Sequence, residues 1–522
     1  MTTAETPEGD QTEVEAFLSD PASYPVRPER VERLDTHGAM VFLAGDEAWK
    51  IKRAVAYPYM DFSTLTKREA VCRREVEVNR TWAPELYLGC VPITRQRDGG
   101  LAIGNGGEPV EWAVHMRRFP QETLLAWIAA HEGVTEALAR DLADVAFESH
   151  TRAERIAACN SAARMREHAV ALADNIAGQV PTLPADQAEQ FKTRALDQHV
   201  RVSDLLDRRA AEGFVRRCHG DSHLGNIVLW NGRPMLFDAI EFDEEIARID
   251  TLYDLAFLLM DLDHRGLRKA ANIVLNRYLW RSGVLSDVDG LASLPLFMGL
   301  RAGVRAMVTA ERARQSQDKM DIETAQGYLA AALGYLDPAP PQLIAVAGLS
   351  GTGKSTLAAR LAPEFAPAPG ALHLRSDLER KSLFGAGETE RLGAEAYTPE
   401  AAARVYEILI EKAQRALAAG HSVIVDAVYA RAHERDRLEE AAAVLGVSLR
   451  GLWLKASPET MMSRVTDRRN DASDATVDVV RQQLDYDLGE LSGRWTVIDA
   501  GQDIERTAEA ANAVLRGEIT RP

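Results

Sequence analysis

The sequence predicts two parts of different fold class: an α+β part with a small β-rich lobe and a larger helical lobe, then an α/β part built on a parallel sheet. Short strand-like runs fill residues 30–120, helical patterns dominate residues 121–336, and apolar runs alternate with amphipathic stretches over residues 342–522. Three prolines within residues 337–341 cannot continue a helix, so this segment is predicted to be a stiff linker between the two parts.

The composition indicates a globular chain with more than one core. The 522 residues are 46% apolar and 27% charged, and one core rarely serves more than about 250–300 residues. The net charge of −17 disfavours general nucleic-acid binding, because the summed field repels phosphate. Apolar runs such as Leu255–Met260 are too short to span a bilayer, and the acidic start of the sequence lacks the features of a secretory signal. We therefore expect a cytoplasmic protein without a membrane segment.

The cysteines give no sign of a metal site or a disulfide framework. They lie far apart, without a CxxC pair, at Cys72, Cys90, Cys159 and Cys218. This spacing predicts reduced thiols in or near a core.

The β-rich lobe is predicted from four strand-like runs and one helix. The helix is Lys67–Arg80, and the glycine-rich segment Gly99–Gly107 predicts a hairpin turn. The four runs are Met40–Leu43, Ala48–Ile51, Tyr87–Ile93 and Val110–Met116.

Within the helical lobe, two strand-like runs follow a polar loop that begins His219-Gly220-Asp221. Phosphoryl transfer to a hydroxyl needs an aspartate that orients the hydroxyl, and oxygen ligands that hold Mg²⁺. Asp221 suits the first role, whereas Asn226 and Asp238 suit the second. The alternative is that all three are turn and cap residues.

This stretch resembles the aminoglycoside-phosphotransferase and choline-kinase family, in which HGD replaces the HRD of protein kinases. The resemblance implies a bilobal protein-kinase-like domain over about residues 30–336 that uses ATP and Mg²⁺. It also implies an upstream strand lysine that contacts the nucleotide and pairs with a helix glutamate. Lys50 fits the strand position, with Lys52 as the competitor, and Glu75 fits the helix position, with Glu69 as the alternative.

Two features depart from this pattern or extend it. No GxGxxG loop is present, and only His37-Gly38 occupies the turn before the first strand-like run. An acidic run after Asp238 includes Glu241, which could bind a cationic acceptor such as an amino sugar. The alternative is that this run is a solvated face.

The α/β part begins with the apolar run Leu343–Ala347, which leads into the sequence GLSGTGKST and then a helical pattern. This matches GxxxxGK[ST] in the context of strand, loop and helix. The glycines let backbone N–H groups face phosphate, Lys354 can reach the β- and γ-phosphates, and Ser355 can ligate Mg²⁺. The predicted nucleotide-binding residues are Gly348, Ser350, Gly351, Thr352, Gly353, Lys354, Ser355 and Thr356.

A second strand-like run, Leu372–Leu374, is followed by Asp377 and Arg380. An aspartate at a strand end can hold an acceptor hydroxyl, and an arginine one turn later can contact the substrate. The alternative is a helix N-cap at Ser376 or Asp377 beside a solvated arginine.

A third run, Ser422–Val425, ends at Asp426, which is placed for a water-mediated contact to Mg²⁺. A later helix carries Arg464, Arg468 and Arg469. Arginines on one mobile helix could form a lid that neutralises charge on the transferred phosphate. The alternative is a solvated amphipathic face.

Together these residues resemble the polynucleotide-kinase, zeta-toxin and gluconate-kinase group of P-loop kinases over most of residues 342–518. The resemblance implies ATP-dependent phosphorylation of a hydroxyl. Asp377 would be the acceptor-positioning base and Arg380 a substrate contact. Arg464 and Arg468 would be lid residues, the first towards the nucleotide and the second towards the substrate.

We therefore expect an ATP- and Mg²⁺-dependent phosphotransferase with two nucleotide sites that acts on hydroxyl groups of small molecules such as sugars or amino sugars. Two alternatives stay open. One half could be a non-catalytic kinase-like module that regulates the other, or the P-loop half could phosphorylate 5′-hydroxyl ends of nucleic acid. A degenerate kinase could lose any catalytic residue without unfolding, so the presence of the full set argues against the first alternative.

Overall fold

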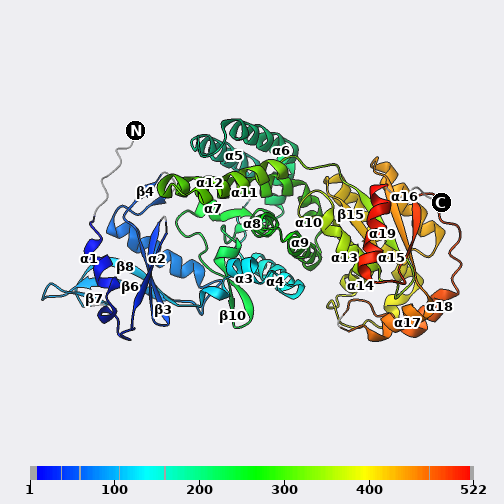
Figure 1. Ribbon diagram of the computed structural model, residues 1–522, viewed down its shortest axis with the longest axis horizontal. Coiled ribbons are helices and arrows are strands. Elements are labelled where there is room, and N and C mark those ends of the chain that lie inside the picture. The colour runs from blue at the N-terminus through cyan, green and yellow to red at the C-terminus, as the bar shows by residue number, and fades with distance from the viewer. Residues whose placement is uncertain are drawn as a thin grey trace. The chain divides into compact units, whose positions relative to one another are not determined.

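The computed structural model describes residues 9–517 except 37, 58–59, 105, 158–159 and 470 (Figure 1). His37 and Cys159 therefore lie outside the described residues. The chain divides into two compact units, and each is described by itself. Unit 1 comprises Met1–Val134, Glu148–Ala158 and Gly213–Leu258, and unit 2 comprises Thr135–Phe147, Cys159–Glu212 and Leu259–Pro522.

A six-stranded antiparallel sheet forms the β-rich lobe of unit 1, in the order β1-β2-β3-β8-β6-β7. Helix α2 (Leu65–Asn79) begins after the N-cap residue Thr64 and buries Cys72 and Val76 in one cluster with the apolar side chains of β8. The strands are β1 (Val31–Asp35), β2 (Ala39–Ala44), β3 (Glu47–Lys52), β6 (Tyr87–Arg95), β7 (Leu101–Ile103) and β8 (Glu108–Arg117).

The glycine-rich segment Gly99–Gly107 differs from its prediction as a simple turn. It contains strand β7, in which Ala102 pairs with Thr94 of β6. The prediction missed this strand because it has only three residues and glycines on both sides, whereas the extended end of β6 gives it a pairing partner. Smaller elements of this lobe are α1 (Thr12–Ser19), η1 (Pro21–Ser23), β4 (Ala56–Tyr57), β5 (Met60–Asp61), η2 (Gln121–Thr123) and α3 (Leu125–His131).

The remainder of unit 1 holds a tight hairpin after the polar loop. Strands β10 (Ile227–Trp230) and β11 (Arg233–Leu236) pair antiparallel across Asn231 and Gly232. Both turn residues have positive φ, at 50° and 78°, which is the turn geometry that matches the twist of a two-residue hairpin. The other elements here are β9 (Val215–Arg217), η3 (Leu224–Asn226), α7 (Glu244–Ala247), β12 (Arg248–Asp250) and α8 (Thr251–His264), which continues into unit 2.

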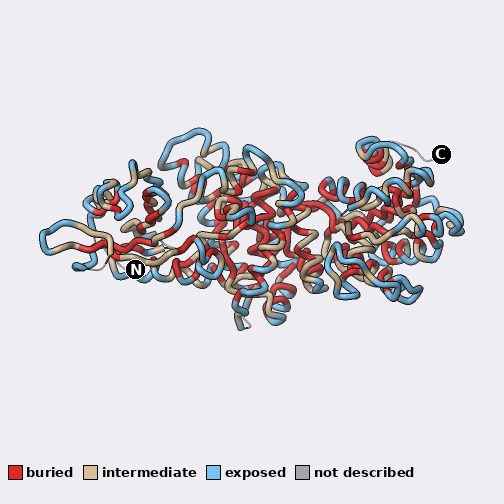
Figure 2. Tube along the Cα trace, turned by 90° about the horizontal axis from the view of Figure 1, so that it is seen from below, coloured by how far each residue is buried: buried red, intermediate tan, exposed pale blue. Residues whose placement is uncertain are grey.

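Unit 2 contains a set of packed helices whose interior is buried (Figure 2). The segment Leu285–Arg314 is long and apolar enough to cross a membrane by length and composition, but 67% of its most apolar window is buried within the protein. This burial is typical of a core helix in a soluble protein. The helices are α4 (Glu136–Arg152), which ends in unit 1, α5 (Ser161–Ala177), α6 (Ala185–Ala211), α9 (Arg268–Ser282), α10 (Leu285–Asp289), η4 (Gly290–Ser293), α11 (Leu294–Ser316) and α12 (Lys319–Tyr335).

Unit 2 also contains the predicted parallel sheet, with five strands in the order β14-β15-β13-β16-β17. All residues of β13 are buried, as expected for a central strand covered on both faces. The strands are β13 (Leu343–Ala347), β14 (Leu372–Arg375), β15 (Val423–Asp426), β16 (Leu449–Lys455) and β17 (Trp495–Asp499). The helices are α13 (Lys354–Leu361), η5 (Ala362–Glu364), α14 (Ser376–Leu383), η6 (Ala394–Tyr397), α15 (Pro399–Ala418), α16 (Ala432–Val444), α17 (Pro458–Asp467), α18 (Val477–Leu484) and α19 (Ile504–Arg516).

The proline-rich segment 337–341 separates α12 from β13, so the change of element type falls where the sequence predicts it. Unit 2 includes the chain on both sides of this segment. The α+β lobes followed by a parallel sheet confirm the predicted fold class, while the role of 337–341 as a linker stays a prediction.

Candidate functional site

In unit 1, strand β3 and helix α2 bring Lys50 and Glu75 together. The Lys50 Nζ lies 2.9 Å from Glu75 Oε1 and 2.6 Å from Asp238 Oδ1. Burial lowers the pKa of Lys50, but the charges of Asp238 and Glu75 outweigh it and raise that pKa well above its usual value. Burial also raises the pKa of Asp238, yet Lys50 outweighs it and brings the value to about 2. Both groups are therefore charged at neutral pH.

Glu75 also contacts the second candidate lysine, Lys52. The Lys52 Nζ lies 2.6 Å from Glu75 Oε2 and 2.5 Å from Glu241 Oε1. Residues 50 and 52 share a face because side chains of a strand alternate, so one fully buried carboxylate bridges both ammonium groups. Glu69, the alternative to Glu75, instead pairs with Arg73 at the surface.

The geometry favours Lys50 over Lys52 as the nucleotide lysine, because Lys50 is the one that reaches Asp238. Glu241 is 8% exposed and is bound to Lys52. Through Lys52 it is connected to Glu75, the partner of Lys50. This placement favours a role in holding the two lysines over the acceptor contact predicted from the acidic run. An acceptor could reach the carboxylate only by breaking its ion pair.

The polar loop holds Asp221 and Asn226 against each other. The Asn226 side-chain nitrogen donates to Asp221 Oδ2 at 2.8 Å and to the Asp221 carbonyl at 2.9 Å. Gly220 has φ of 86°, and its N–H donates to Asp254 Oδ1 at 2.8 Å. His150 Nε2 lies 3.0 Å from the other Asp254 oxygen, so helix α8 anchors the loop from below. Neither Asp254 nor His150 was among the site residues predicted from the sequence.

The hairpin brings Asp238 beside the loop, since Phe237 N–H donates to the Asn226 carbonyl at 3.0 Å. Asp238 has φ of 59°, a left-handed conformation that aspartate tolerates better than most residues and that often marks functional sites. Because Asn226 donates through its nitrogen, its carbonyl oxygen is the atom that could ligate a cation. With the Asp238 carboxylate it makes an oxygen donor pair that suits Mg²⁺.

In unit 2, the loop between β13 and α13 has the geometry of a phosphate cradle. Gly348, Gly351 and Gly353 have φ of 139°, 85° and 92°. A Cβ on Gly351 would lie 2.4 Å from the Met461 carbonyl, so only glycine fits there. The Lys354 Nζ donates to the Leu349 carbonyl at 3.1 Å, and burial lowers the pKa of this lysine.

A groove of about 360 Å³ opens beside this loop and could hold the nucleotide. Arg464 lines it and donates to the carbonyls of Ala500 at 2.8 Å and Gln502 at 3.0 Å. It therefore ties the loop after β17 to the phosphate cradle. Arg468, which also lines the groove, lies 3.3 Å from Asp471. The groove also includes Thr352, Thr356, Asp467 and Thr507.

On the other side of the cradle, the ends of β14 and β15 bring Asp377 near Asp426. Burial and then the charge of Asp426 raise the pKa of Asp377, whereas Arg375 opposes this rise. Burial raises the pKa of Asp426 too, but His373, Lys354 and Arg375 outweigh it and hold that pKa below its usual value. Ser355 and Asp426 supply oxygen atoms suited to Mg²⁺, and Asp377 is the carboxylate with the greater affinity for a proton.

Two arginines of this region, Arg380 and Arg375, hold different partners. Arg380 donates to the Ala396 carbonyl at 2.5 Å and lies 5.1 Å from the Tyr397 ring centroid, so it shapes one wall of this region. Arg375 lies 3.0 Å from Asp471 and 3.9 Å from Asp426. Sequence reasoning passed over it, although its place two residues before the aspartate was a usable signal.

Comparisons with known proteins give two separate matches along the chain. Residues 62–292 match the phosphotransferase enzyme family, and residues 343–487 match an AAA domain. Residues 62–292 therefore form a domain that is similar to the phosphotransferase enzyme family, and residues 343–487 form a P-loop domain that is similar to an AAA domain.

Over its whole length the chain is similar to an uncharacterized protein of Mycobacterium tuberculosis, with 29% identity over 510 residues, 95% of this chain and 98% of that protein. Among solved structures it is similar to a sugar kinase from a Janibacter species, with 24% identity and a TM-score of 0.28, covering 34% of this chain and 95% of that one. It is also similar to a choline/ethanolamine kinase family protein from Mesorhizobium loti, with 16% identity and a TM-score of 0.37, covering 62% of this chain and 95% of that one.

Proposed function

We propose that this chain is a cytoplasmic ATP- and Mg²⁺-dependent phosphotransferase with two nucleotide sites, each phosphorylating a hydroxyl group of a small molecule such as a sugar or amino sugar. The proposal rests on one observation: each unit holds a complete set of groups for the same chemistry. Each set has a lysine for the phosphates, oxygen donors for a metal and a separate aspartate for the acceptor.

In the kinase-like site, Lys50 would neutralise phosphate charge and Glu75 would hold that lysine in place. Asp221 would accept or orient the proton of the acceptor hydroxyl, and its bond to Asn226 would fix its direction. Asn226 and Asp238 would hold Mg²⁺, which supplies charge neutralisation to the phosphates when it is bound.

In the P-loop site, backbone N–H groups from Gly351 to Thr356 would cradle the phosphates, and Lys354 would reach the transferred group. Ser355 and Asp426 would hold Mg²⁺. Asp377, whose pKa is raised, suits proton acceptance from a hydroxyl because a carboxylate with higher proton affinity is the better base. Arg468 and Arg380 would border the acceptor.

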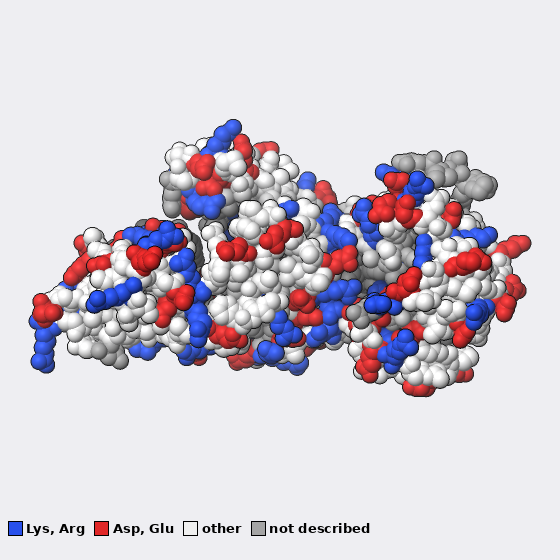
Figure 3. Space-filling model, turned by 60° about the horizontal axis from the view of Figure 1, so that its bottom comes forward, with Lys and Arg blue, Asp and Glu red and all other residues white. Residues whose placement is uncertain are grey.

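The surface supports a small-molecule acceptor over nucleic acid. On the face drawn in Figure 3, basic and acidic side chains are intermixed. The net charge is −17, and a nucleic-acid kinase would need a segregated basic path to overcome such a field.

The test uses the full chain with one site silenced at a time, because unit 2 contains helices from both sides of residues 337–341. Lys354→Ala silences the P-loop site, and Asp221→Asn silences the kinase-like site. Each variant is incubated with radiolabelled ATP and a panel of sugars, amino sugars, nucleosides and oligonucleotides. We expect each single variant to retain transfer to one small-molecule acceptor and the double variant to lose all transfer.

Other outcomes identify the alternatives. If Asp221→Asn leaves every transfer reaction unchanged, the kinase-like half is a binding or regulatory module. If only oligonucleotides accept phosphate from the P-loop site, that half is a nucleic-acid end kinase.

A further inference from the structure

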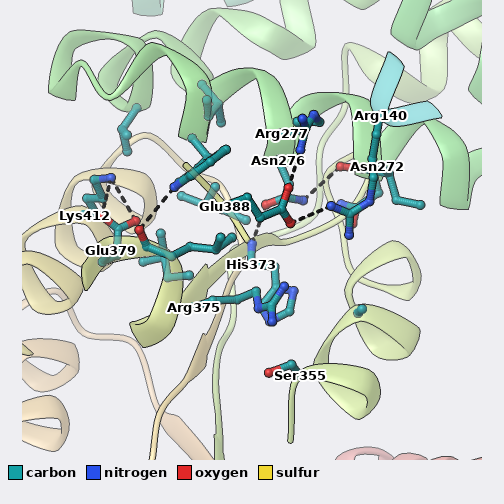
Figure 4. Close-up of a pocket in the computed structure, with 18 residues that line it drawn as sticks. Arg140, Asn272, Asn276, Arg277, Ser355, His373, Arg375, Glu379, Glu388 and Lys412 are labelled. Atoms are coloured by element: carbon teal, nitrogen blue, oxygen red, sulfur yellow. Dashed lines mark hydrogen bonds and ion pairs between the residues drawn. The ribbon is translucent and has the colours of Figure 1, made fainter. Parts of the chain in front are cut away.

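Strand β14 lies at the edge of the parallel sheet and pairs only with β15. An edge strand presents N–H and C=O groups without strand partners, and proteins cover or blunt such edges. Here helix α9 covers it, as Figure 4 shows with Asn272 and Asn276 pointing towards the strand. The helix and the strand belong to the same unit.

One side-chain amide takes the place of a neighbouring strand. The N–H of His373 donates to Asn276 Oδ1 at 2.6 Å, and Asn276 Nδ2 donates to the Ala371 carbonyl at 3.2 Å. Leu372, between them, directs its N–H inwards to Ser422 at 2.8 Å. Asn276 therefore bonds His373 of β14 and Ala371, the residue just before that strand, with the same donor and acceptor that a peptide group offers. Asn272 adds a second bond to the Ala371 carbonyl at 3.0 Å.

The same helix contacts the segment after the strand. Trp280 Nε1 donates to the Leu378 carbonyl at 3.2 Å, and Arg277 pairs with Glu388 at 2.6 Å. The bonds to His373 and Leu378 lie on either side of Asp377 in the chain. Helix α9 thus holds the strand that leads into this aspartate and the first turn of the helix that carries it.

A cavity of about 120 Å³ lies between α9, β14 and α13, and both Asn276 and Ser355 line it (Figure 4). This space gives β14 room to shift if the bonds from Asn276 are lost. A displacement of about 1 Å at a reacting group can cost about a hundredfold in rate.

We propose that Asn276 is a positioning residue for the P-loop site, which acts by fixing β14 and through it Asp377. The inference rests on the proposed function of that site. It means that the acceptor side of the P-loop site is completed by a helix from the part of the chain before residues 337–341, whereas the phosphate cradle is built wholly after them.

The test compares three variants of the full chain carrying Asp221→Asn, so that only the P-loop site transfers phosphate. Asn276→Ala removes both bonds to β14. Asn276→Asp keeps the oxygen that accepts from His373 N–H but loses the donor to Ala371. Arg268→Ala is the matched control, because Arg268 lies on the same helix and bonds the Phe365 carbonyl at 3.0 Å, away from β14.

Steady-state kinetics use radiolabelled ATP and the acceptor found with the panel above. We expect Asn276→Ala to lower kcat about tenfold to a hundredfold with the KM for ATP within about twofold of the parent, because the cradle does not depend on β14. Asn276→Asp should recover part of kcat, and Arg268→Ala should match the parent. Amide hydrogen exchange at His373 should be faster in Asn276→Ala only.

Several results would overturn the inference. An unchanged kcat in Asn276→Ala would show that the bonds to β14 do not position Asp377. Equal losses of kcat in Asn276→Ala and Arg268→Ala would show that any loosened contact of α9 has this effect, not the bonds of Asn276 in particular. A rise in the KM for ATP that accompanies the loss of kcat would show damage to the whole site. In contrast, a parent protein without Lys354-dependent transfer to any acceptor would contradict the proposed function itself.

Discussion

The Lys50 ammonium lies 2.6 Å from the carboxylate of Asp238, the residue that we propose as a metal ligand. In the proposed kinase-like site, Lys50 would neutralise phosphate charge and Asp238 would help to hold Mg²⁺. Their contact pairs a positive and a negative side chain where the phosphates would bind. We therefore expect Asp238 to act on the nucleotide, whereas Asp221 would act on the acceptor.

The role of Asp221 should separate from that of Asp238 in single variants. Asp221→Asn should abolish transfer by the kinase-like site while ATP affinity changes little, because this side chain faces the acceptor. Asp238→Asn should weaken Mg²⁺-dependent nucleotide binding, because it removes a charged ligand. Calorimetric titration with ATP, with and without Mg²⁺, measures the affinity for the nucleotide. Transfer assays in a Lys354→Ala background measure turnover by the kinase-like site. Identical effects of the two changes on affinity and turnover would contradict the assignment.

The carboxylate of Glu75 should contribute several kcal/mol to the free energy of unfolding of unit 1. Glu75→Gln leaves two buried ammonium groups with one fewer negative charge, and breaking a buried ion pair in this way costs about 3–5 kcal/mol. Glu69→Gln is the control on the same helix, and its exposed pair with Arg73 should change stability by no more than about 1 kcal/mol. Urea unfolding followed by circular dichroism compares the stabilities of the two variants. Equal unfolding midpoints for Glu75→Gln and Glu69→Gln would refute the bridging role of Glu75.

Lys354→Ala should abolish transfer by the P-loop site, because no lysine that could replace Lys354 lines the groove beside the cradle among the described residues. Lys455→Ala, at the exposed end of β16, serves as the control and should retain parental rates. Transfer assays in the Asp221→Asn background give the comparison. Turnover by the Lys354→Ala variant at the parental rate would contradict the assignment of the nucleotide site to this loop.

Asp377→Asn distinguishes a base from a residue that only stabilises the first turn of α14. The structure rules out the predicted N-cap role, because the N-cap of this helix is Arg375. The change keeps the shape and one oxygen but loses the charge, so turnover should fall about a hundredfold or more if Asp377 accepts the hydroxyl proton. A residue that only favours the helix N-terminus through its charge would lose about 0.3–1 kcal/mol of stability and keep parental kinetics. Kinetics on the identified acceptor and a thermal melt decide between them. Parental kinetics in this variant would leave only the ATP site.

The pH profile of the P-loop site should shift when Arg375 is neutralised. Burial and Asp426 raise the pKa of Asp377 above its ordinary value of 3.8, and Arg375 holds the rise in check. A base must be ionised, so the rate falls as pH drops through this pKa. Arg375→Gln should raise the pKa further and move the acid limb of kcat/KM to higher pH.

The control for this shift is Arg360→Gln, which removes a charge from an exposed side chain on α13. Profiles of kcat/KM against pH, recorded in the Asp221→Asn background, should coincide for this control and the parent. A limb that moves to lower pH in Arg375→Gln would contradict the proposed electrostatics.

The sequence predicted both fold classes, because periodicity and motif spacing follow local rules. Strand alternation places Lys50 and Lys52 on one face, and the spacing from Asp221 to Asn226 and the hairpin that follows bring Asp238 near. The family resemblance favoured Lys50, with Lys52 as the competitor, whereas only the structure shows that Lys50 is the lysine that reaches Asp238 across the fold.

Contacts between distant segments were not predictable in the same way. Nothing in the sequence near Asn276 indicates that its amide bonds an edge strand almost a hundred residues later. Glu241 likewise looked like part of an exposed acidic run, whereas the fold buries it against Lys52. Such pairings depend on tertiary packing, which periodicity and motif spacing do not encode.

The two units are also interleaved along the chain, and this affects how the protein is made. The chain passes between them after residues 134, 147, 158, 212 and 258. On a ribosome, the β-rich sheet is complete once residue 117 has emerged, but Asp221 and Asp238 follow only after long segments of unit 2. At roughly 5–20 residues per second, the lobe that carries Lys50 waits on the order of ten seconds for its catalytic partners. During that time Lys50 cannot pair with Asp238, nor Lys52 with Glu241.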